Sequence, residues 1–205
     1  MQDFIHGDKT VVFQALSGEV IGSEKLNETL VSSSGGGGYV GKEGGHVAAA
    51  QISSVNVINH EFWVKTSNGK ECDVKLRGYD IPLRTGQQIT LISAGNKGGA
   101  NVYHSVLVNH SADKQWVLKN GDGLNKQLGL TPYNYKALLI ALALWIVLGY
   151  VTGAYALGFL VGAVFYGYQY FKDSKRTKAL VNALDNHLAH LVQQSLERHE
   201  QRDAA

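Results

Sequence analysis

The fold is decided by residues 137–171, which read ALLIALALWIVLGYVTGAYALGFLVGAVFYGYQYF. This stretch lies between Lys136 and Lys172, and its 35 residues include no charged side chain. An uncharged apolar run of about 18 residues or more is typical of a membrane span. The sequence therefore predicts an integral protein of the cell (inner) membrane.

The length of this stretch favours two spans. As one helix its 35 residues would run about 52 Å, against a hydrocarbon core of about 30 Å. Residues 149–155 hold two glycines, a threonine and two tyrosines, which suits a bend at the far interface. We expect a transmembrane helical hairpin over residues 137–171. One long, tilted or kinked helix is the alternative.

Basic residues flank both ends of the uncharged stretch. They are Lys126 and Lys136 before it, and Lys172, Lys175, Arg176 and Lys178 after it. Positively charged flanks favour the cytoplasmic side of a membrane. We therefore expect the soluble domain and the C-terminal tail in the cytoplasm, whereas a single span would place one of them outside.

Small residues in the stretch are spaced for close helix packing. Gly149 and Gly153 form one GxxxG pattern, and Gly158 and Gly162 form another. Such spacing lets helix backbones approach closely. We expect these glycines to pack the two arms of one hairpin. Dimerisation between molecules is the alternative.

Ahead of the membrane, residues 10–118 read as short strands separated by Gly, Asn and Asp. This pattern predicts a mainly β soluble domain, with a small SH3/OB-like antiparallel barrel as its form. The expected organisation is N-terminal strand(s) and a Gly-rich loop (residues 1–46), the small β-barrel domain (47–120), a linker to the membrane (121–136), the transmembrane hairpin (137–171) and an amphipathic helical tail (172–205).

One hairpin of this domain can be predicted in detail. Residues 60–66 and 70–76 flank Ser67, Asn68 and Gly69. A two-residue loop would mix the buried and exposed faces of the two strands. A three-residue loop with Gly69 left-handed keeps the faces separate. It aligns Val64 with Cys72, Phe62 with Val74, and Lys65 with Glu71.

The tail after the membrane carries apolar residues at helical spacing. Four of them fit a heptad seam and form the expected association face: Val181, Leu184, Leu188 and Leu191. Ser195 and Arg198 end the seam after about two heptads, which is short for a coiled coil. Packing of this helix on the β domain, or binding at the membrane surface, is the alternative.

Composition and charge bound the function. The formal net charge is +2, from 19 basic and 17 acidic residues that are well mixed, so no nucleic-acid partner is expected. The chain has one cysteine, Cys72, which cannot form an intramolecular disulfide. This favours a reducing cytoplasm for the soluble part.

Two motifs bear on cofactors and metals. Gly36, Gly38 and Gly41 match GxGxxG, but Glu43 stands where a phosphate loop needs a hydroxyl. We interpret residues 35–45 as a flexible or tightly turned loop, with no cofactor. Among eight histidines, only His187 and His190 have i,i+3 spacing. No Glu or Cys joins them in a zinc pattern, so no metal is expected.

No nucleophile, base and orienting group form a recognisable local arrangement, so an enzyme is not expected. The sequence favours a membrane-anchored, non-enzymatic interaction or assembly scaffold. Its expected partners are membrane lipid and a second copy in a homo-oligomer, or another membrane protein. An oligomeric transport or pore component is the first alternative. A membrane-tethered ligand-binding protein or enzyme that uses the loop at residues 35–45 is the second.

Overall fold

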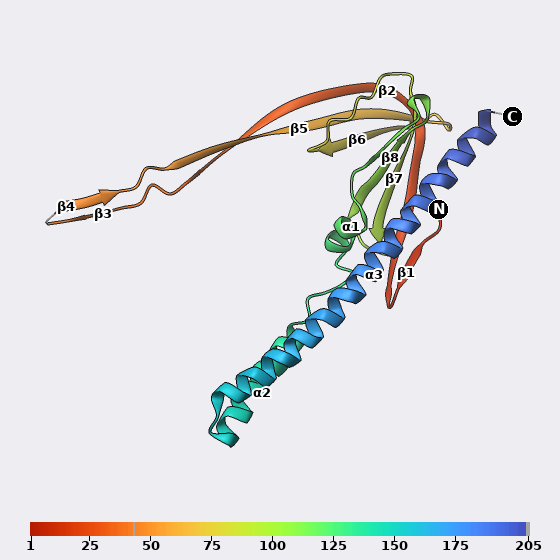
Figure 1. Ribbon diagram of the computed structural model, residues 1–205. Coiled ribbons are helices and arrows are strands. Elements are labelled where there is room, and N and C mark those ends of the chain that lie inside the picture. Colours follow the sequence, from red (N-terminus) through yellow and green to blue (C-terminus); the bar gives the residue numbers. More distant parts are fainter. Residues whose placement is uncertain (43, 204–205) are drawn as a thin grey trace. The chain divides into compact units, whose positions relative to one another are not determined.

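The computed structural model describes residues 1–42 and 44–203. The chain folds into a mostly antiparallel β sheet and a long C-terminal helix (Figure 1). The elements are β1 (Phe4–His6), β2 (Lys9–Ser34), β3 (Gly38–Gly41), β4 (Gly44–Val47), β5 (Gln51–Thr66), β6 (Glu71–Arg77), β7 (Gln88–Asn96), β8 (Val102–Asn109), the 3-10 helix η1 (His110–Ala112), β9 (Lys114–Val117), α1 (Gly121–Leu128), α2 (Tyr135–Thr152) and α3 (Tyr155–Asp203).

The main sheet is open. Its strands pair in the order β6-β5-β2-β7-β8-β9, with β1 beside β2, and β3 pairs with β4 in a separate two-stranded sheet. The prediction of an SH3/OB-like barrel is therefore wrong. The physical reason is strand length: β2 has 26 residues and β5 has 16, whereas β6 has 7 and β9 has 4. A barrel needs strands whose stagger is consistent all the way round.

The long strands also correct the expectation that Gly and Asn would interrupt them. Gly18 and Gly22 lie inside β2, and Asn56 lies inside β5. A Cβ atom at Gly18 would stand 2.3 Å from the Lys65 carbonyl oxygen, so close strand approach requires glycine there. The strand continues past a register shift between Val20 and Gly22. Such a bulge bends a strand without ending it.

The predicted register of the β5–β6 hairpin is confirmed. Gly69 has a left-handed φ of 81°, and its N–H donates to the Thr66 carbonyl at 2.9 Å. The aligned pairs are Phe62 with Val74, Val64 with Cys72, and Lys65 with Glu71. Val74 and Leu76 are buried on one face, as the alternation of apolar and charged residues predicts.

The chain divides into two compact units, each with its own apolar core. Unit 1 comprises residues 1–15, 91–107 and 117–205. It holds β1, the first part of β2, most of β7 and β8, and the three α helices. Its core is formed by residues such as Val11, Phe13, Leu91, Leu107, Leu124, Leu184 and Leu191.

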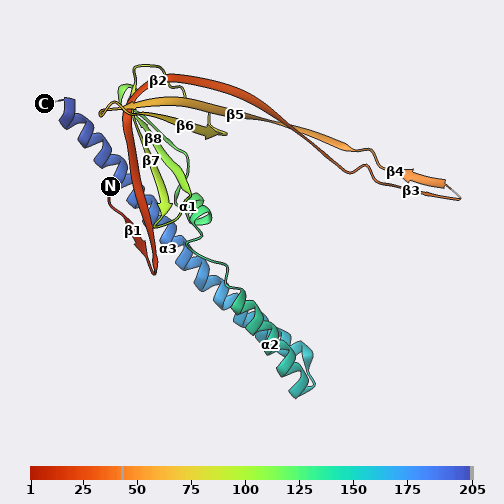
Figure 2. The same cartoon turned by 180° about the vertical axis from the view of Figure 1, so that it is seen from behind.

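Unit 2 comprises residues 16–90 and 108–116. It holds the β2–β5–β6 part of the sheet, and its core includes Val20, Phe62, Val64, Val74, Leu76, Ile81 and Ile89. Beyond this core, β2 and β5 continue together as a two-stranded ribbon, with β3 and β4 at its end (Figure 2).

We predict that Gly18→Ala lowers the free energy of unfolding by about 1–3 kcal/mol, because the new methyl group overpacks against the Lys65 backbone. The matched control is Gly22→Ala in the same strand, where the nearest atom, Trp63 Cδ1, would stand 3.9 Å away. Chemical denaturation of the two variants measures the difference. Equal stability would contradict the strand approach described here.

Candidate functional site

The candidate site is the helical hairpin of unit 1. Helix α2 ends at Gly153, which caps it with a left-handed φ of 70°, and α3 begins two residues later at Tyr155. The two helices then pack along each other. The reversal falls inside the interval, residues 149–155, where the sequence predicts a bend.

Glycine creates the seam between α2 and α3. A Cβ atom at Gly158 would lie 2.6 Å from the Trp145 carbonyl oxygen, and one at Gly162 would lie 2.6 Å from the Ala141 carbonyl oxygen. Real Cβ atoms are not found this close to backbone atoms, so the two helices approach at a distance that only glycine permits.

The other two predicted glycines have different surroundings. A Cβ atom at Gly149 would lie 2.5 Å from Cδ1 of Tyr155, which starts the returning helix. Gly153 has no atom within 4 Å of a Cβ position, and its left-handed backbone makes the turn. Three of the four glycines therefore lie at close contacts, and the fourth reverses the chain.

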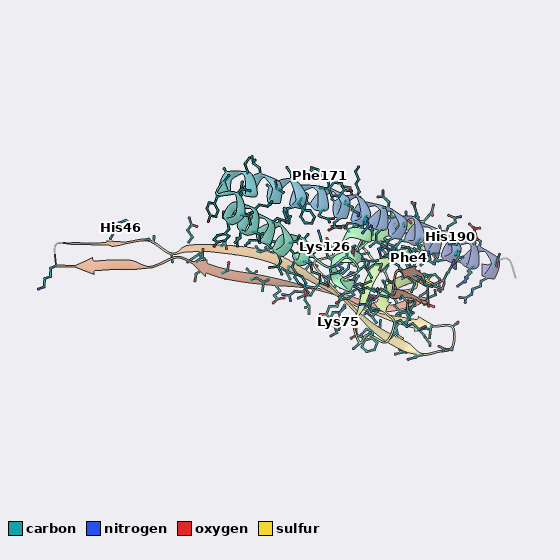
Figure 3. All side chains as sticks on the ribbon, turned by 90° about the horizontal axis from the view of Figure 1, so that it is seen from below. Phe4, His46, Lys75, Lys126, Phe171 and His190 are labelled. Carbon is teal, nitrogen blue, oxygen red and sulfur yellow. The ribbon has the colours of Figure 1, made fainter. Side chains whose placement is uncertain are left out.

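The outer surface of the hairpin is apolar. Among the described residues, α2 is the one helix long and apolar enough to cross a membrane, and only 11% of its span is buried. Its exposed side chains include Leu139, Ile140, Leu142, Ile146 and Val147, and those on α3 include Leu157, Phe159, Leu160, Val161 and Val164. Phe171, labelled in Figure 3, is the last residue before the charged part of α3.

Polar contacts tie the two open ends of the hairpin together. Asn134 caps α2 by accepting the Ala137 N–H at 3.2 Å, and its amide donates to Asp173 at 3.0 Å. The hydroxyls of Tyr133 and Tyr166 lie 2.9 Å apart. The chain thus enters and leaves the hairpin at the same end, where its basic residues also gather.

The predicted association face of the tail lies on α3 and packs inside unit 1. Leu184, Leu188 and Leu191 are buried, and Val181 is half-buried. This is the packing on the β domain that the sequence leaves open as an alternative. With these side chains covered by the chain itself, the face offers little apolar surface to a second molecule.

Histidine and glycine complete the packing of α3. The His187 ring lies 5.1 Å from the Phe13 ring and 5.6 Å from the Phe4 ring. Its Nε2 atom lies 3.0 Å from the Gln2 carbonyl oxygen. At the N-terminus of α1, the Gly121 N–H donates to Asp185 at 2.6 Å. His187 therefore packs against Phe4 of β1 and Phe13 of β2.

A polar pair in unit 2 is not predicted by any local sequence pattern. Ser23 Oγ on β2 and His60 Nε2 on β5 lie 2.8 Å apart, and His60 is fully buried. Burial lowers the pKa of His60 first, the Lys25 ammonium lowers it further, and Asp80 opposes both. Lys25 and Asp80 form an ion pair beside the imidazole. Ser23 and His60 are 37 residues apart in the chain. Only the register of β2 against β5 brings them together, and no local pattern indicates that register.

This serine and histidine do not form a catalytic triad in the described residues. His60 Nδ1 is buried and finds no hydrogen-bond partner there, so no carboxylate orients the ring as a triad requires. A lowered pKa also weakens the imidazole as a general base near neutral pH. The arrangement suits a neutral histidine built into a sheet.

The remaining motifs also lack a site geometry. The glycines at residues 35–38 lead into strand β3, which pairs with β4, whereas a phosphate loop leads into a helix. Within residues 1–42 and 44–203, no group of three His, Cys, Asp or Glu side chains could hold a metal ion. No protein-family model, no curated protein and no solved structure matches the chain.

We predict that Gly158→Ala destabilises the hairpin by about 1–3 kcal/mol, because the methyl group pushes α3 away from the Trp145 backbone. Gly167→Ala, on the same helix, is the matched control, since a Cβ atom there meets nothing within 4 Å. Alanine favours a helix over glycine by about 0.5–1 kcal/mol, so the control should be slightly stabilised. Thermal unfolding in detergent tests both, and a destabilised Gly167→Ala variant would contradict this account.

His60 makes folding sensitive to acid. Its pKa is lowered from the ordinary value of 6.5, so below about pH 6.5 the unfolded chain binds a proton that the folded chain resists. The contribution of neutral His60 to the free energy of unfolding is fully present above that pH and is lost as the pH falls. We predict that His60→Gln flattens the decline in unfolding free energy between about pH 7.5 and 5.5. Burial also lowers the pKa of His104, so part of the pH dependence of stability remains in the variant. An unchanged slope in the His60→Gln variant would show that His60 does not cause this pH dependence.

Proposed function

We propose that this chain is a membrane-anchored, non-enzymatic assembly protein, held in the membrane by the α2–α3 hairpin. The observation that carries the proposal is the apolar outer surface of α2. A core helix of a soluble protein can be equally long and apolar, but such a helix is mostly buried, whereas only 11% of α2 is buried. Helix α2 also begins at Tyr135, far from the position of a signal sequence.

The dimensions of α2 support a span. Its 18 residues rise by about 27 Å, close to a hydrocarbon core of about 30 Å. Exposed leucine, isoleucine and valine side chains suit lipid rather than water. The returning part of α3, up to Phe171, is equally free of charge and packs on α2 through Gly158 and Gly162.

The charges at the open end of the hairpin support its orientation. Lys136 precedes α2's apolar run, and Lys172, Lys175, Arg176 and Lys178 follow the return. The contact between Asn134 and Asp173 keeps both flanks at one end. Under the positive-inside rule that end faces the cytoplasm. We therefore place the bend, with Thr152, on the far side of the inner membrane.

Assembly, rather than catalysis, fits the rest of the molecule. The long β2–β5 ribbon of unit 2 leaves Leu26, Leu30, Val31, Ile52 and Val55 exposed. Exposed apolar side chains gathered on one element mark a surface for interaction. The Ser23–His60 pair lacks an orienting group among the described residues, so the geometry supports binding better than acyl transfer.

Topology is tested with single cysteines in a Cys72→Ser background. The probes are Ser34→Cys on β2, Gln201→Cys on α3 and Thr152→Cys at the bend, all at exposed positions. We expect an impermeant thiol reagent on intact cells to label the Thr152 variant only, because the other two probes face the cytoplasm. The Ser34 and Gln201 variants should react once the membrane is broken.

Two results would overturn this proposal. Release of the protein by alkaline carbonate would show that the hairpin does not span the membrane. Labelling of Ser34→Cys or Gln201→Cys alone in intact cells would show a single crossing. Assembly itself is measured by the mass of the detergent-solubilised chain over a concentration series, and a monomer at every concentration would contradict it.

A further inference from the structure

The ribbon of unit 2 has an element without a partner strand. We define the β arm as residues 26–34 of β2 and 51–59 of β5, which pair from Leu26 with Asn59 to Ser34 with Gln51. β6 pairs with β5 only from Asn59 to Lys65. Along residues 51–58, β5 therefore has β2 on one side and no described strand on the other. Figure 3 shows Lys75 of β6 at the base of this ribbon and His46 near its tip.

The outer edge of the arm has free backbone groups. The Ile58 carbonyl accepts the Gly78 N–H at 2.8 Å on the side away from β2. Backbone groups of alternate residues point to the same side of a strand. Those of Ile52, Ser54 and Asn56 therefore point outward as well, where the described strands offer no partner. Unpaired edges of this kind are templates for another strand.

Natural edges are usually protected, and this edge is not. Lysine, proline or an inward-pointing charge blocks pairing on most exposed edges. Residues 52–58 read ISSVNVI and contain none of these. A segment of six or seven residues with high β propensity, no charge and no proline is the pattern of strands that pair with copies of themselves.

We propose that this edge of β5, over residues 53–57, pairs antiparallel with the same edge of a second copy, about a two-fold axis at Val55. This inference rests on the proposed assembly function and names its surface. A two-fold axis brings identical patches together. With Val55 at the centre, Ser53 of one copy faces Val57 of the other, and no like charges meet along the edge.

Side chains on one face of the arm support this register. Leu30 of β2 lies directly across from Val55 of β5, and both are exposed, at 42% and 60%. Pairing about Val55 places the two Val55 side chains side by side, with one Leu30 on each outer strand. The four form one continuous apolar row across four strands, where each copy alone has only a pair. Cross-strand apolar pairs of this kind stabilise sheets.

The membrane makes a short edge sufficient. Two chains anchored in one bilayer meet at a much higher effective concentration than free chains do. Five residues of strand pairing then need less intrinsic affinity than a soluble dimer would. The tail face on α3 is mostly buried, with Leu184, Leu188 and Leu191 covered, so the arm is the better candidate for contact between copies.

Disulfide trapping in membranes tests the pairing. Val55→Cys in the full chain with Cys72→Ser should form a disulfide-linked dimer on mild oxidation. Directly opposed residues of paired strands have the Cα separation that a disulfide needs, roughly 4.4–6.8 Å. Leu30→Cys on the same face is the matched control. Its two copies would be three strand spacings apart, about 14 Å, and should stay monomeric.

Charge exchange at the axis is an independent test. Val55→Lys and Val55→Glu should each weaken dimerisation by about tenfold, because like charges meet directly. An equimolar mixture of the two variants should associate again, which a merely misfolded arm could not do. The readout is the mass of complexes in detergent, with carbonate-resistant membrane attachment as the folding and anchoring control.

The outcomes separate this proposal from the proposed function. A Leu30→Cys dimer without a Val55→Cys dimer, or a Lys and Glu mixture that stays dissociated, overturns pairing through β5. If wild-type chains still associate in that case, assembly stands and uses another surface. If wild-type chains remain monomeric, both fail. If association is lost in the charge variants while carbonate resistance persists, the arm is the contact.

Discussion

Backbone hydrogen bonding in an uncharged segment is the constraint on which the hairpin depends. Residues 137–171 offer few polar side chains, so their N–H and C=O groups must pair with one another, and a helix does this within one segment. The helix can reverse only where the backbone can turn, at Gly153. Because Gly158 and Gly162 lack side chains, the backbone of α3 packs directly against the backbone of α2.

Strand β2 imposes a second constraint, because it contributes to both units. Its first part buries Val11 and Phe13 in unit 1, and its middle buries Val20 in unit 2. Past Leu26 it has β5 as its described neighbour and no core beneath it. A two-stranded ribbon is marginal in water. Polar pairs such as Ser32 with Ser53 and Thr29 with Asn56 hold it together, so little apolar burial stabilises the arm.

The sequence predicts those features that depend on neighbouring residues. Alternation of apolar and charged side chains, with one glycine at the turn, was enough for the β5–β6 register and the conformation of Gly69. Helix length against membrane thickness predicts a reversal, and the glycines, threonine and tyrosines of residues 149–155 predict its place, where Gly153 turns the chain. In both cases the deciding residues lie within one turn or one helix of each other, where periodicity is informative.

Long-range pairing is where the prediction failed. The sequence predicts short strands separated by Gly, Asn and Asp, but Gly18 lies inside the long strand β2, where the Lys65 backbone approaches it closely. That contact joins residues far apart in the chain and leaves no local pattern. The same holds for Ser23 and His60. An open sheet rather than a barrel follows from these long strands, which no short window of sequence could show.

The continuity of α3 determines how the hairpin connects to the rest of unit 1. This helix runs from Tyr155 to Asp203 without interruption, and its 49 residues extend for about 74 Å. From residue 168 onward the sequence contains neither glycine nor proline, the residues that usually kink a helix. Its apolar beginning packs on α2, and Leu184 and Leu191 are buried in the core of unit 1. One unbroken helix therefore carries both the packing seam with α2 and the side chains that enter the core of unit 1, so the same element serves the hairpin and that core.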